Sequence, residues 1–399
     1  MKVREAELAD TISELLAAHR ADAPAIGAPG REWQTYGGLR DLSQEVRGSL
    51  NGFGIGPRDR VAIVLPNGPE MAAAFVTIAQ AATTAPLNPA YREEEFAFYL
   101  EDLKAKAILV AEDYDGPALK AAERFGLTVL RLHVPEGAPA GTFRLSGPAR
   151  SPAEGRPGPD DIALILHTSG TTSRPKIVPL LQSNIVASAR HIGTSLELGP
   201  SDRCLNVMPL FHIHGLVAAV AASLAVGGSI WCAPGFDALR FFGWMSEAKP
   251  TWYTAVPTMH QAILSRAVRN SDVIAANPLR FVRSSSASLP PQVFAALTEA
   301  FGAPVIEGYG MTEAAHQMAS NPLPPRSQKP GSVGVAAGPL VRIAHEADDR
   351  LIDGTGEVVI SGPNVTPGYE GNAEANAKNF FEAAGKRWFR TGDQGAFDE

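Results

Sequence analysis

One segment near the middle of the chain constrains the fold more than any other. Residues 162–166 are Ile-Ala-Leu-Ile-Leu, an apolar run typical of a buried strand. Hydroxyl side chains around one glycine follow at residues 167–173, and Arg-Pro-Lys at 174–176 ends this run. Ser183 and Asn184 then favour the N-cap of a helix with an apolar stripe. The pattern predicts a strand, a polar loop and a helix in succession.

The polar loop contains the groups that bind phosphate. Gly170 lets the backbone turn closely, and Lys176 supplies a positive charge. The amides and hydroxyls that can donate to phosphate oxygens belong to Thr168, Ser169, Thr171 and Thr172. The loop is not a Walker A loop, which needs Gly-Lys-Ser/Thr after four spacer residues. A polar surface loop without a ligand is the alternative, because clusters of Ser, Thr and Gly commonly form one.

Strands and helices alternate on both sides of this loop. Apolar runs predict strands at residues 60–65, 107–110, 127–132, 205–208, 230–232, 252–255, 281–282 and 305–306. Helices are expected at residues 70–82, 216–226, 238–248, 258–267 and 291–301. Residues 11–53 predict helices around a short extended piece at 32–36. The alternation predicts an α/β protein whose parallel sheets are covered on both faces.

The composition and the predicted secondary structure of the chain change at residue 322. Beyond it Gly and Pro are frequent, and short strands such as 341–343 and 356–360 predominate. We therefore expect two packed α/β subdomains over residues 1–321, which carry the ligand sites, and a β-rich subdomain over residues 322–399.

The composition of the chain limits its possible binding partners and its cellular compartment. The formal net charge of −7 disfavours nucleic acid or an anionic membrane as the main partner. The two cysteines, Cys204 and Cys232, make a disulfide framework improbable, and the charged N-terminus lacks the apolar segment of a signal peptide. We expect a cytoplasmic protein; a peroxisomal targeting signal that follows residue 399 is the alternative. The oligomeric state does not follow from the sequence.

A second motif occupies residues 307–313, Glu-Gly-Tyr-Gly-Met-Thr-Glu, where a predicted strand ends. Ligands of open α/β sheets commonly bind at such strand ends. The ring of Tyr309 offers a surface on which adenine can stack, and Thr312 offers a hydroxyl. Glu313 is a hard oxygen ligand suited to Mg²⁺. A glycine-rich turn with a surface glutamate is the alternative.

Four ordered motifs together resemble the adenylate-forming superfamily of acyl-CoA synthetases, luciferases and peptide-synthetase adenylation domains. They are residues 168–176, 209–215 (Pro-Leu-Phe-His-Ile-His-Gly), 307–313 and 389–393 (Phe-Arg-Thr-Gly-Asp). The resemblance covers essentially the whole chain. It implies the large N-terminal domain of such an enzyme, with two αβαβα-type sheets and a small β-barrel-like subdomain.

The resemblance also implies roles for individual residues. Thr168, Lys176, Thr312 and Glu313 would be catalytic, and Glu313 would hold Mg²⁺. The nucleotide would contact Thr168, Ser169, Gly170, Thr171, Thr172, Lys176, Ser286, Ala287, Ser288, Glu307, Gly308, Tyr309, Gly310, Met311, Thr312 and Asp393. The acid would contact His212, His214, Ser286 and His316. Metal ligation by the two neighbouring histidines is disfavoured, because no cysteine or carboxylate stands near them.

Three segments look more specifically like oxalate–CoA ligases: residues 168–179, 311–324 and 329–334. Histidine and serine around the acid suit a small anion, whereas a long acyl chain needs apolar walls. The resemblance implies an ATP-dependent ligase that uses ATP, Mg²⁺ and CoA and forms acyl-AMP and then acyl-CoA. Oxalate is the expected acid; malonate or another short dicarboxylate, and a medium-chain acid, are the alternatives. A nucleotide-binding module without turnover and a phosphotransferase are the other classes considered.

Two departures from the superfamily pattern matter. Ile177 stands where a glycine is expected after the loop lysine. The superfamily continues beyond the equivalent of residue 399 into a small C-terminal domain that carries a catalytic lysine. We therefore expect the chain to be the N-terminal part of such an enzyme, with nucleotide binding but little turnover by itself.

Overall fold

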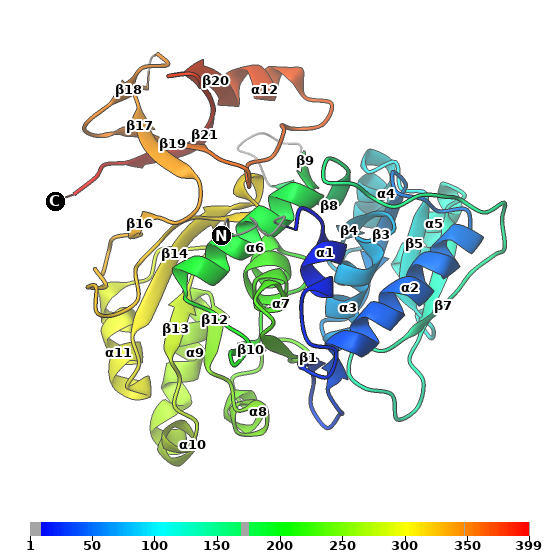
Figure 1. Cartoon of the computed structure of the whole chain (residues 1–399), viewed down its shortest axis with the longest axis horizontal. Coiled ribbons are helices and arrows are strands. Elements are labelled where there is room, and N and C mark those ends of the chain that lie inside the picture. The colour runs from blue at the N-terminus through cyan, green and yellow to red at the C-terminus, as the bar shows by residue number, and fades with distance from the viewer. Residues whose placement is uncertain (1–8, 169–174, 347, 399) are drawn as a thin grey trace, which may run out of the picture.

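A computed structural model of the chain describes residues 9–168, 175–346 and 348–398. Within these residues the strands form three sheets (Figure 1). In the same ranges, no helix has both the length and the apolar character needed to cross a membrane.

The first sheet has the strand order β7-β6-β5-β3-β4-β8-β9. Its strands are β3 (Arg60–Val64), β4 (Thr83–Pro86), β5 (Ala107–Ala111), β6 (Thr128–His133), β7 (Arg144–Ser146), β8 (Ile162–Thr168) and β9 (Lys176–Leu181). The five central strands run parallel, and both edge strands are antiparallel to their neighbours. Helices α2 (Tyr36–Gly52) and α3 (Pro69–Ile78) cover one face. Helices α4 (Glu93–Asp102) and α5 (Pro117–Arg124) cover the other.

The second sheet has the order β16-β15-β14-β13-β12-β10-β11-β1-β2. Its strands are β1 (Pro24–Gly27), β2 (Gln34–Thr35), β10 (Arg203–Asn206), β11 (Ser229–Cys232), β12 (Trp252–Ala255), β13 (Phe281–Ser284), β14 (Val305–Met311), β15 (His316–Ser320) and β16 (Val335–Ala336). The strands from β14 to β1 run parallel. The N-terminal β1 was not predicted; its Ile26 and Gly27 pair with Ile230 and Trp231 of β11, about 200 residues away in the chain.

Helices cover both faces of the second sheet. One face packs against α8 (Phe241–Ala248), α9 (Pro257–Ala267), α10 (Ser271–Ala276) and α11 (Pro291–Phe301), with the short η2 (Val268–Asn270) between α9 and α10. The other faces α1 (Ile12–Ala17), α6 (Gln182–Ser195), the π-helical η1 (His214–Ala221) and α7 (Ala222–Ala225). These helices lie between the two large sheets, where the main apolar core forms.

The third sheet is antiparallel, with the order β18-β17-β19-β21-β20. Its strands are β17 (Leu340–Ala344), β18 (Leu351–Ile352), β19 (Gly356–Ser361), β20 (Phe380–Ala383) and β21 (Lys386–Gly395), with α12 (Ala373–Asn379) before β20. Figure 1 shows this curved sheet at one end of the molecule, beyond β9. The predicted fold class, two helix-covered α/β sheets and a small barrel-like sheet, is confirmed.

One local prediction is wrong. The polar loop does not lead directly into a helix, because residues 176–181 form β9, which pairs antiparallel with β8. The apolar residues Ile177, Val178 and Leu180 are buried on this strand. Helix α6 then begins at Gln182 with Leu181 at its N-cap, and the Asn184 side chain accepts a hydrogen bond from the Leu181 amide. The loop therefore connects two strands of a hairpin. Because no helix begins directly after it, a helix dipole does not contribute to phosphate binding by this loop.

Candidate functional site

The main candidate site is a cleft of about 400 Å³ between the two large sheets, open to solvent. It lies where β8 and β14 end and where η1 begins. The residues that line it are Leu166, His167, Thr168, Met208, Phe211, His212, Ile213, His214, Val256, Ser286, Gly310, Met311, Thr312, Glu313 and His316. Segments separated by more than 140 residues thus meet in one cavity, as expected for ligand sites at strand ends.

Glu313 sits at one end of the cleft, in the short η3 (Thr312–Ala314). Its side chain is buried, and its Oε1 accepts a hydrogen bond of 2.8 Å from the hydroxyl of Tyr369. The ring of Tyr369 lies 4.5 Å from the Nζ of Lys176, a cation–π distance. Burial and the neighbouring carboxylate of Glu313 raise the pKa of Tyr369, so its hydroxyl keeps its proton and donates it. One tyrosine therefore contacts a carboxylate through its hydroxyl and an ammonium group through its ring.

Thr168, which directly precedes the hydroxyl-rich loop, lines the same cleft. The hydroxyl oxygen of Thr168, the last residue of β8, is buried and has no hydrogen-bond partner within the described residues. A polar atom of this kind is typical of a site that a ligand completes. Four predicted nucleotide contacts, Ser169, Gly170, Thr171 and Thr172, lie outside the described residues.

The predicted adenosine-binding residues Tyr309 and Asp393 are neighbours in space. Although 84 positions separate them, the hydroxyl of Tyr309 donates a hydrogen bond to the Asp393 carboxylate. Burial raises the pKa of Tyr309, so the phenol remains a donor. The Asp393 amide donates to the hydroxyl of Thr391 at 3.1 Å, which orders the turn in β21. The two motifs therefore meet at the junction of the second and third sheets.

Two glycines of β14 are required by close approach of other groups. A Cβ on Gly310 would overlap the carbonyl oxygen of His316 on the paired strand β15. A Cβ on Gly308 would lie 2.8 Å from Nη2 of Arg283. Because neither glycine has a side chain, β15 and the buried Arg283 can pack directly against β14, the strand that leads into the cleft.

The turn after β13 contains the predicted residues Ser286, Ala287 and Ser288. All three are exposed, and Ser286 has a left-handed backbone with φ of 70°. The backbone amide of Leu289 donates to Oε1 of Glu307 at 2.9 Å. Glu307 is itself buried, and burial raises its pKa. The side chain of Glu307 thus anchors the turn, while Ser286 points into the cleft.

Three histidines, His212, His214 and His316, also line the cleft. His214 is buried between two hydroxyls: its Nδ1 lies 2.9 Å from Oγ of Ser286, and its Nε2 lies 2.6 Å from Oγ1 of Thr254. The ring centroid of His316 lies 5.1 Å from that of His214. His316 has a φ of 97°, a conformation rare for residues other than glycine. Burial lowers the pKa of His212.

Burial, followed by the positive charge of Arg283, holds the pKa of both His214 and His316 well below the usual range. Both rings are therefore neutral near pH 7 and act through hydrogen bonds.

Sequence reasoning missed several residues that shape the site. Tyr369 belongs to no recognised motif, and only the packing of the third sheet brings it to Glu313. Thr254 lies inside the predicted strand 252–255, and Arg283 directly follows the predicted strand 281–282, so alternation along β12 and β13 could have placed them on one face. Their proximity to His214 depends on strand order, which the sequence does not show.

The described residues contain no group of three histidine, cysteine or carboxylate side chains that could hold a metal ion. A magnesium ion that takes most of its ligands from nucleotide phosphates and water needs only one or two carboxylates. Glu313, buried and oriented by Tyr369, fits that requirement.

The fold and the cleft together define an α/β enzyme whose site contains neutral histidines and a buried carboxylate, held by a tyrosine whose ring faces a lysine. The chain belongs to the family of AMP-binding enzymes, whose model matches residues 14–370.

Among its relatives, an oxalate–CoA ligase from Arabidopsis thaliana is 43% identical over 401 residues, covering 98% of this chain and 77% of that protein. An oxalate–CoA ligase from Saccharomyces cerevisiae is 41% identical over 369 residues, covering 86% of this chain and 66% of that protein. The crystal structure of ATP-bound MatB from Rhodopseudomonas palustris superposes with a TM-score of 0.83 at 26% identity, covering 98% of this chain and 77% of that structure.

Proposed function

We propose that the protein is an ATP-dependent acid–CoA ligase and that its acid is oxalate. In the first step a carboxylate oxygen of the acid attacks the α-phosphorus of ATP, and pyrophosphate leaves as acyl-AMP forms. In the second step the thiol of CoA attacks the acyl carbon, and AMP leaves as the thioester forms. The observation that carries the proposal is the meeting of Thr168, Glu313 and His316 in one cleft.

The phosphate end of the cleft has the charges that the first step needs. Two anions must approach each other, so positive charge has to offset their repulsion. Lys176 supplies an ammonium group, and Thr168 offers a hydroxyl that has no hydrogen-bond partner among the residues that the structure describes. Glu313 would hold Mg²⁺, which neutralises charge on the phosphates when it is bound. Tyr369 keeps the Glu313 carboxylate in a fixed position.

The acid end suits a small, polar acid. His214 and Ser286 form a hydrogen-bonded pair at the wall of the cleft, and His316 lies beside them. A short dicarboxylate can accept hydrogen bonds from such groups at its second carboxylate. A long alkyl chain could not satisfy the buried Nδ1 of His316, which has no hydrogen-bond partner among the described residues, and leaving such an atom unsatisfied is costly. The two oxalate–CoA ligases among the relatives support the same choice.

The adenosine would bind at the junction of the second and third sheets. The ring of Tyr309 would stack on adenine, and the carboxylate of Asp393 would accept hydrogen bonds from the ribose hydroxyls. These two residues already contact each other, so one nucleoside can reach both. The backbone of Gly308 and Gly310 lies on the same strand.

The test is acid-dependent release of pyrophosphate by the full-length protein, measured with oxalate, malonate, acetate and octanoate at equal concentrations. We expect the largest kcat/KM for oxalate, and CoA-dependent formation of oxalyl-CoA confirmed by mass spectrometry. A preference for malonate or octanoate would contradict the choice of acid. Label from the γ-phosphate reaching a product would instead indicate a phosphotransferase.

Nucleotide binding is tested separately on residues 1–399. We expect calorimetry to detect AMP binding to this segment, with little thioester formation by it. Absence of AMP binding would contradict the nucleotide site itself.

A further inference from the structure

A buried arginine lies behind the histidines of the acid end. Arg283 is on β13, where it pairs in register with Thr254 on β12 and Ile306 on β14. Residues in register on parallel strands project from the same face of the sheet. That face is the one covered by α6 and η1, the helix that begins with His214. The side chain of Arg283 is fully buried.

The guanidinium of Arg283 has no counter-ion among the described residues. Its Nη2 donates to Oε1 of Gln317 at 3.3 Å, while Nε and Nη1 have no hydrogen-bond partner there. The group lies against Gly308, where a Cβ would be 2.8 Å from Nη2. Burial lowers the pKa of Arg283 to about 10, so the side chain remains a cation at neutral pH. A buried cation without a partner is costly and therefore needs an explanation.

Arg283 is coupled to both histidines that line the acid end. Its neighbour in register, Thr254, contacts Nε2 of His214 through Oγ1 at 2.6 Å. Its hydrogen-bond partner, Gln317, directly follows His316 in β15. The positive charge of Arg283 contributes to the lowered pKa of His214 and of His316. The histidines thus provide neutral hydrogen-bonding groups, and the charge on this side of the cleft comes from the arginine behind them.

We propose that Arg283 determines the specificity of the acid site by favouring acids that carry a second negative charge over monoanions of the same shape. This inference rests on the proposed function. In a partly desolvated site, a cation several ångströms away still attracts an anion appreciably, because the effective dielectric constant is far below that of water. Arg283 acts through the histidine pair and is a positioning residue; it takes no part in bond making.

Oxalate and oxamate form a matched pair for the test. Oxamate has the shape of oxalate, but a neutral amide replaces its second carboxylate. Each acid is assayed by pyrophosphate release with the full-length protein, and kcat and KM are determined separately. For the wild type we expect kcat/KM to be at least about tenfold higher for oxalate.

Three variants separate charge from structure. In Arg283→Met we expect the KM for oxalate to rise about 30-fold and kcat/KM for oxamate to change less than about threefold. Arg283→Lys, which keeps the charge, should recover a large part of the preference for oxalate. Arg280→Met removes a half-exposed arginine that pairs with Asp202 at 2.6 Å, just before the same strand, and should leave the ratio unchanged.

The outcomes are distinguishable. A wild type that releases pyrophosphate with neither acid overturns the proposed function and, with it, this inference. If the wild type prefers oxalate but Arg283→Met lowers kcat/KM equally for both acids, the inference alone is overturned. The arginine would then only stabilise the folded structure. If Arg283→Met does not fold, as judged by melting temperature and AMP binding, the wild-type ratio decides, and a ratio near one overturns the inference.

Discussion

At the scale of single residues, the phosphate end depends on a short chain of contacts. Tyr369 donates to Glu313, and the ring of Tyr369 faces the ammonium group of Lys176. A carboxylate that is 5% exposed and held by one strong donor is pre-organised for its ligand. The carboxylate supplies charge, and the tyrosine supplies position.

We expect Glu313→Gln to reduce kcat for pyrophosphate release by about 100-fold or more, because the amide cannot hold Mg²⁺ as a carboxylate does. Tyr369→Phe should reduce kcat by about tenfold, since the carboxylate remains but loses its fixed position. Both are measured by pyrophosphate release in a titration with Mg²⁺. Wild-type kinetics for Glu313→Gln, with an unchanged melting temperature, would contradict the assignment.

A second residue-scale effect concerns pH and stability. His260 is fully buried on α9; its Nδ1 lies 3.1 Å from the hydroxyl of Tyr253, and burial lowers its pKa from 6.5 to about 4. Between those two pH values the unfolded chain binds a proton at this histidine and the folded chain does not. Stability therefore rises with pH across this window and is lost as the pH falls through it.

We expect the wild type to lose about 3 kcal/mol more of its free energy of unfolding than His260→Gln between pH 7 and pH 4. Urea unfolding followed by tryptophan fluorescence at several pH values measures this difference. Parallel pH profiles for the two proteins would show that His260 is not buried in its neutral form.

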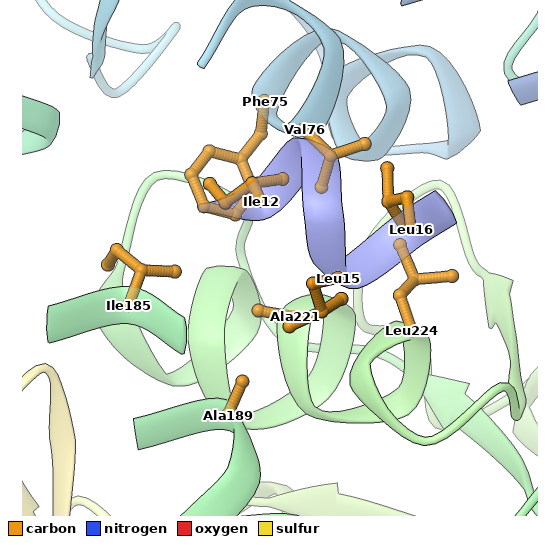
Figure 2. Close-up of a pocket in the computed structure, with 9 residues that line it drawn as sticks. All are labelled: Ile12, Leu15, Leu16, Phe75, Val76, Ile185, Ala189, Ala221 and Leu224. Atoms are coloured by element: carbon orange, nitrogen blue, oxygen red, sulfur yellow. The ribbon is translucent and has the colours of Figure 1, made fainter. Parts of the chain in front are cut away.

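At the scale of elements, the N-terminal helix α1 closes the core between the two large sheets. Figure 2 shows Leu15 and Leu16 directed towards Ala221 and Leu224, with Ile12 beside Phe75. The helix is short, and its start is fixed by Thr11, whose hydroxyl accepts from the Glu14 amide while Glu14 accepts from the Thr11 amide. These side chains border a small, wholly apolar cavity, so the site is a packing region and offers a ligand no polar contact.

We expect Leu16→Ala to lower the free energy of unfolding by about 2–5 kcal/mol, because Leu16 is 1% exposed and its removal enlarges that cavity. Leu239→Ala is the matched control, since Leu239 is 68% exposed; it should change stability by less than about 0.5 kcal/mol. Chemical denaturation measures both. Equal effects would show that α1 is not packed as described.

At the scale of the whole molecule, polar contacts attach the third sheet to the cleft. Asn364 is fully buried, and its side-chain amide donates to the carbonyls of Ala314 at 2.8 Å and Gln317 at 3.1 Å. The backbone amide of Thr366 donates to the carbonyl of Glu313 at 2.8 Å. The segment that carries Glu313 and His316 is therefore held from outside the two large sheets.

We expect Asn364→Ala to cost about 2–3 kcal/mol of stability and to lower kcat for pyrophosphate release, because two buried carbonyls lose their donor next to Glu313. The matched control is Asn372→Ala in the same part of the chain. Asn372 caps α12 at 2.9 Å from the Ala375 amide, so its loss should cost about 1 kcal/mol and leave kcat unchanged. Equal kcat values for the two variants would show that the contacts of Asn364 do not affect the catalytic site.

Local patterns predicted the elements well because they depend on short-range physics. Apolar runs such as 60–65 and 107–110 became buried strands, and the apolar stretch 216–226 lies in the buried helical segments η1 and α7 and the turn after them. The one local error, a helix directly after the polar loop, arose because residues 176–181 satisfy their backbone groups by pairing with β8. A short apolar run does not show by itself whether a pairing partner lies nearby.

The α/β class and the motifs of the candidate site could be predicted from the chain alone, because hydrophobic alternation and glycine-rich strand ends are local properties. Which side chains meet depended on the folded arrangement of the sheets. Tyr369 reaches Glu313, and Arg283 comes to lie behind His214, through strand order and the docking of the third sheet. Such contacts join residues far apart in the chain, and their energies depend on burial and on distances that exist only after folding.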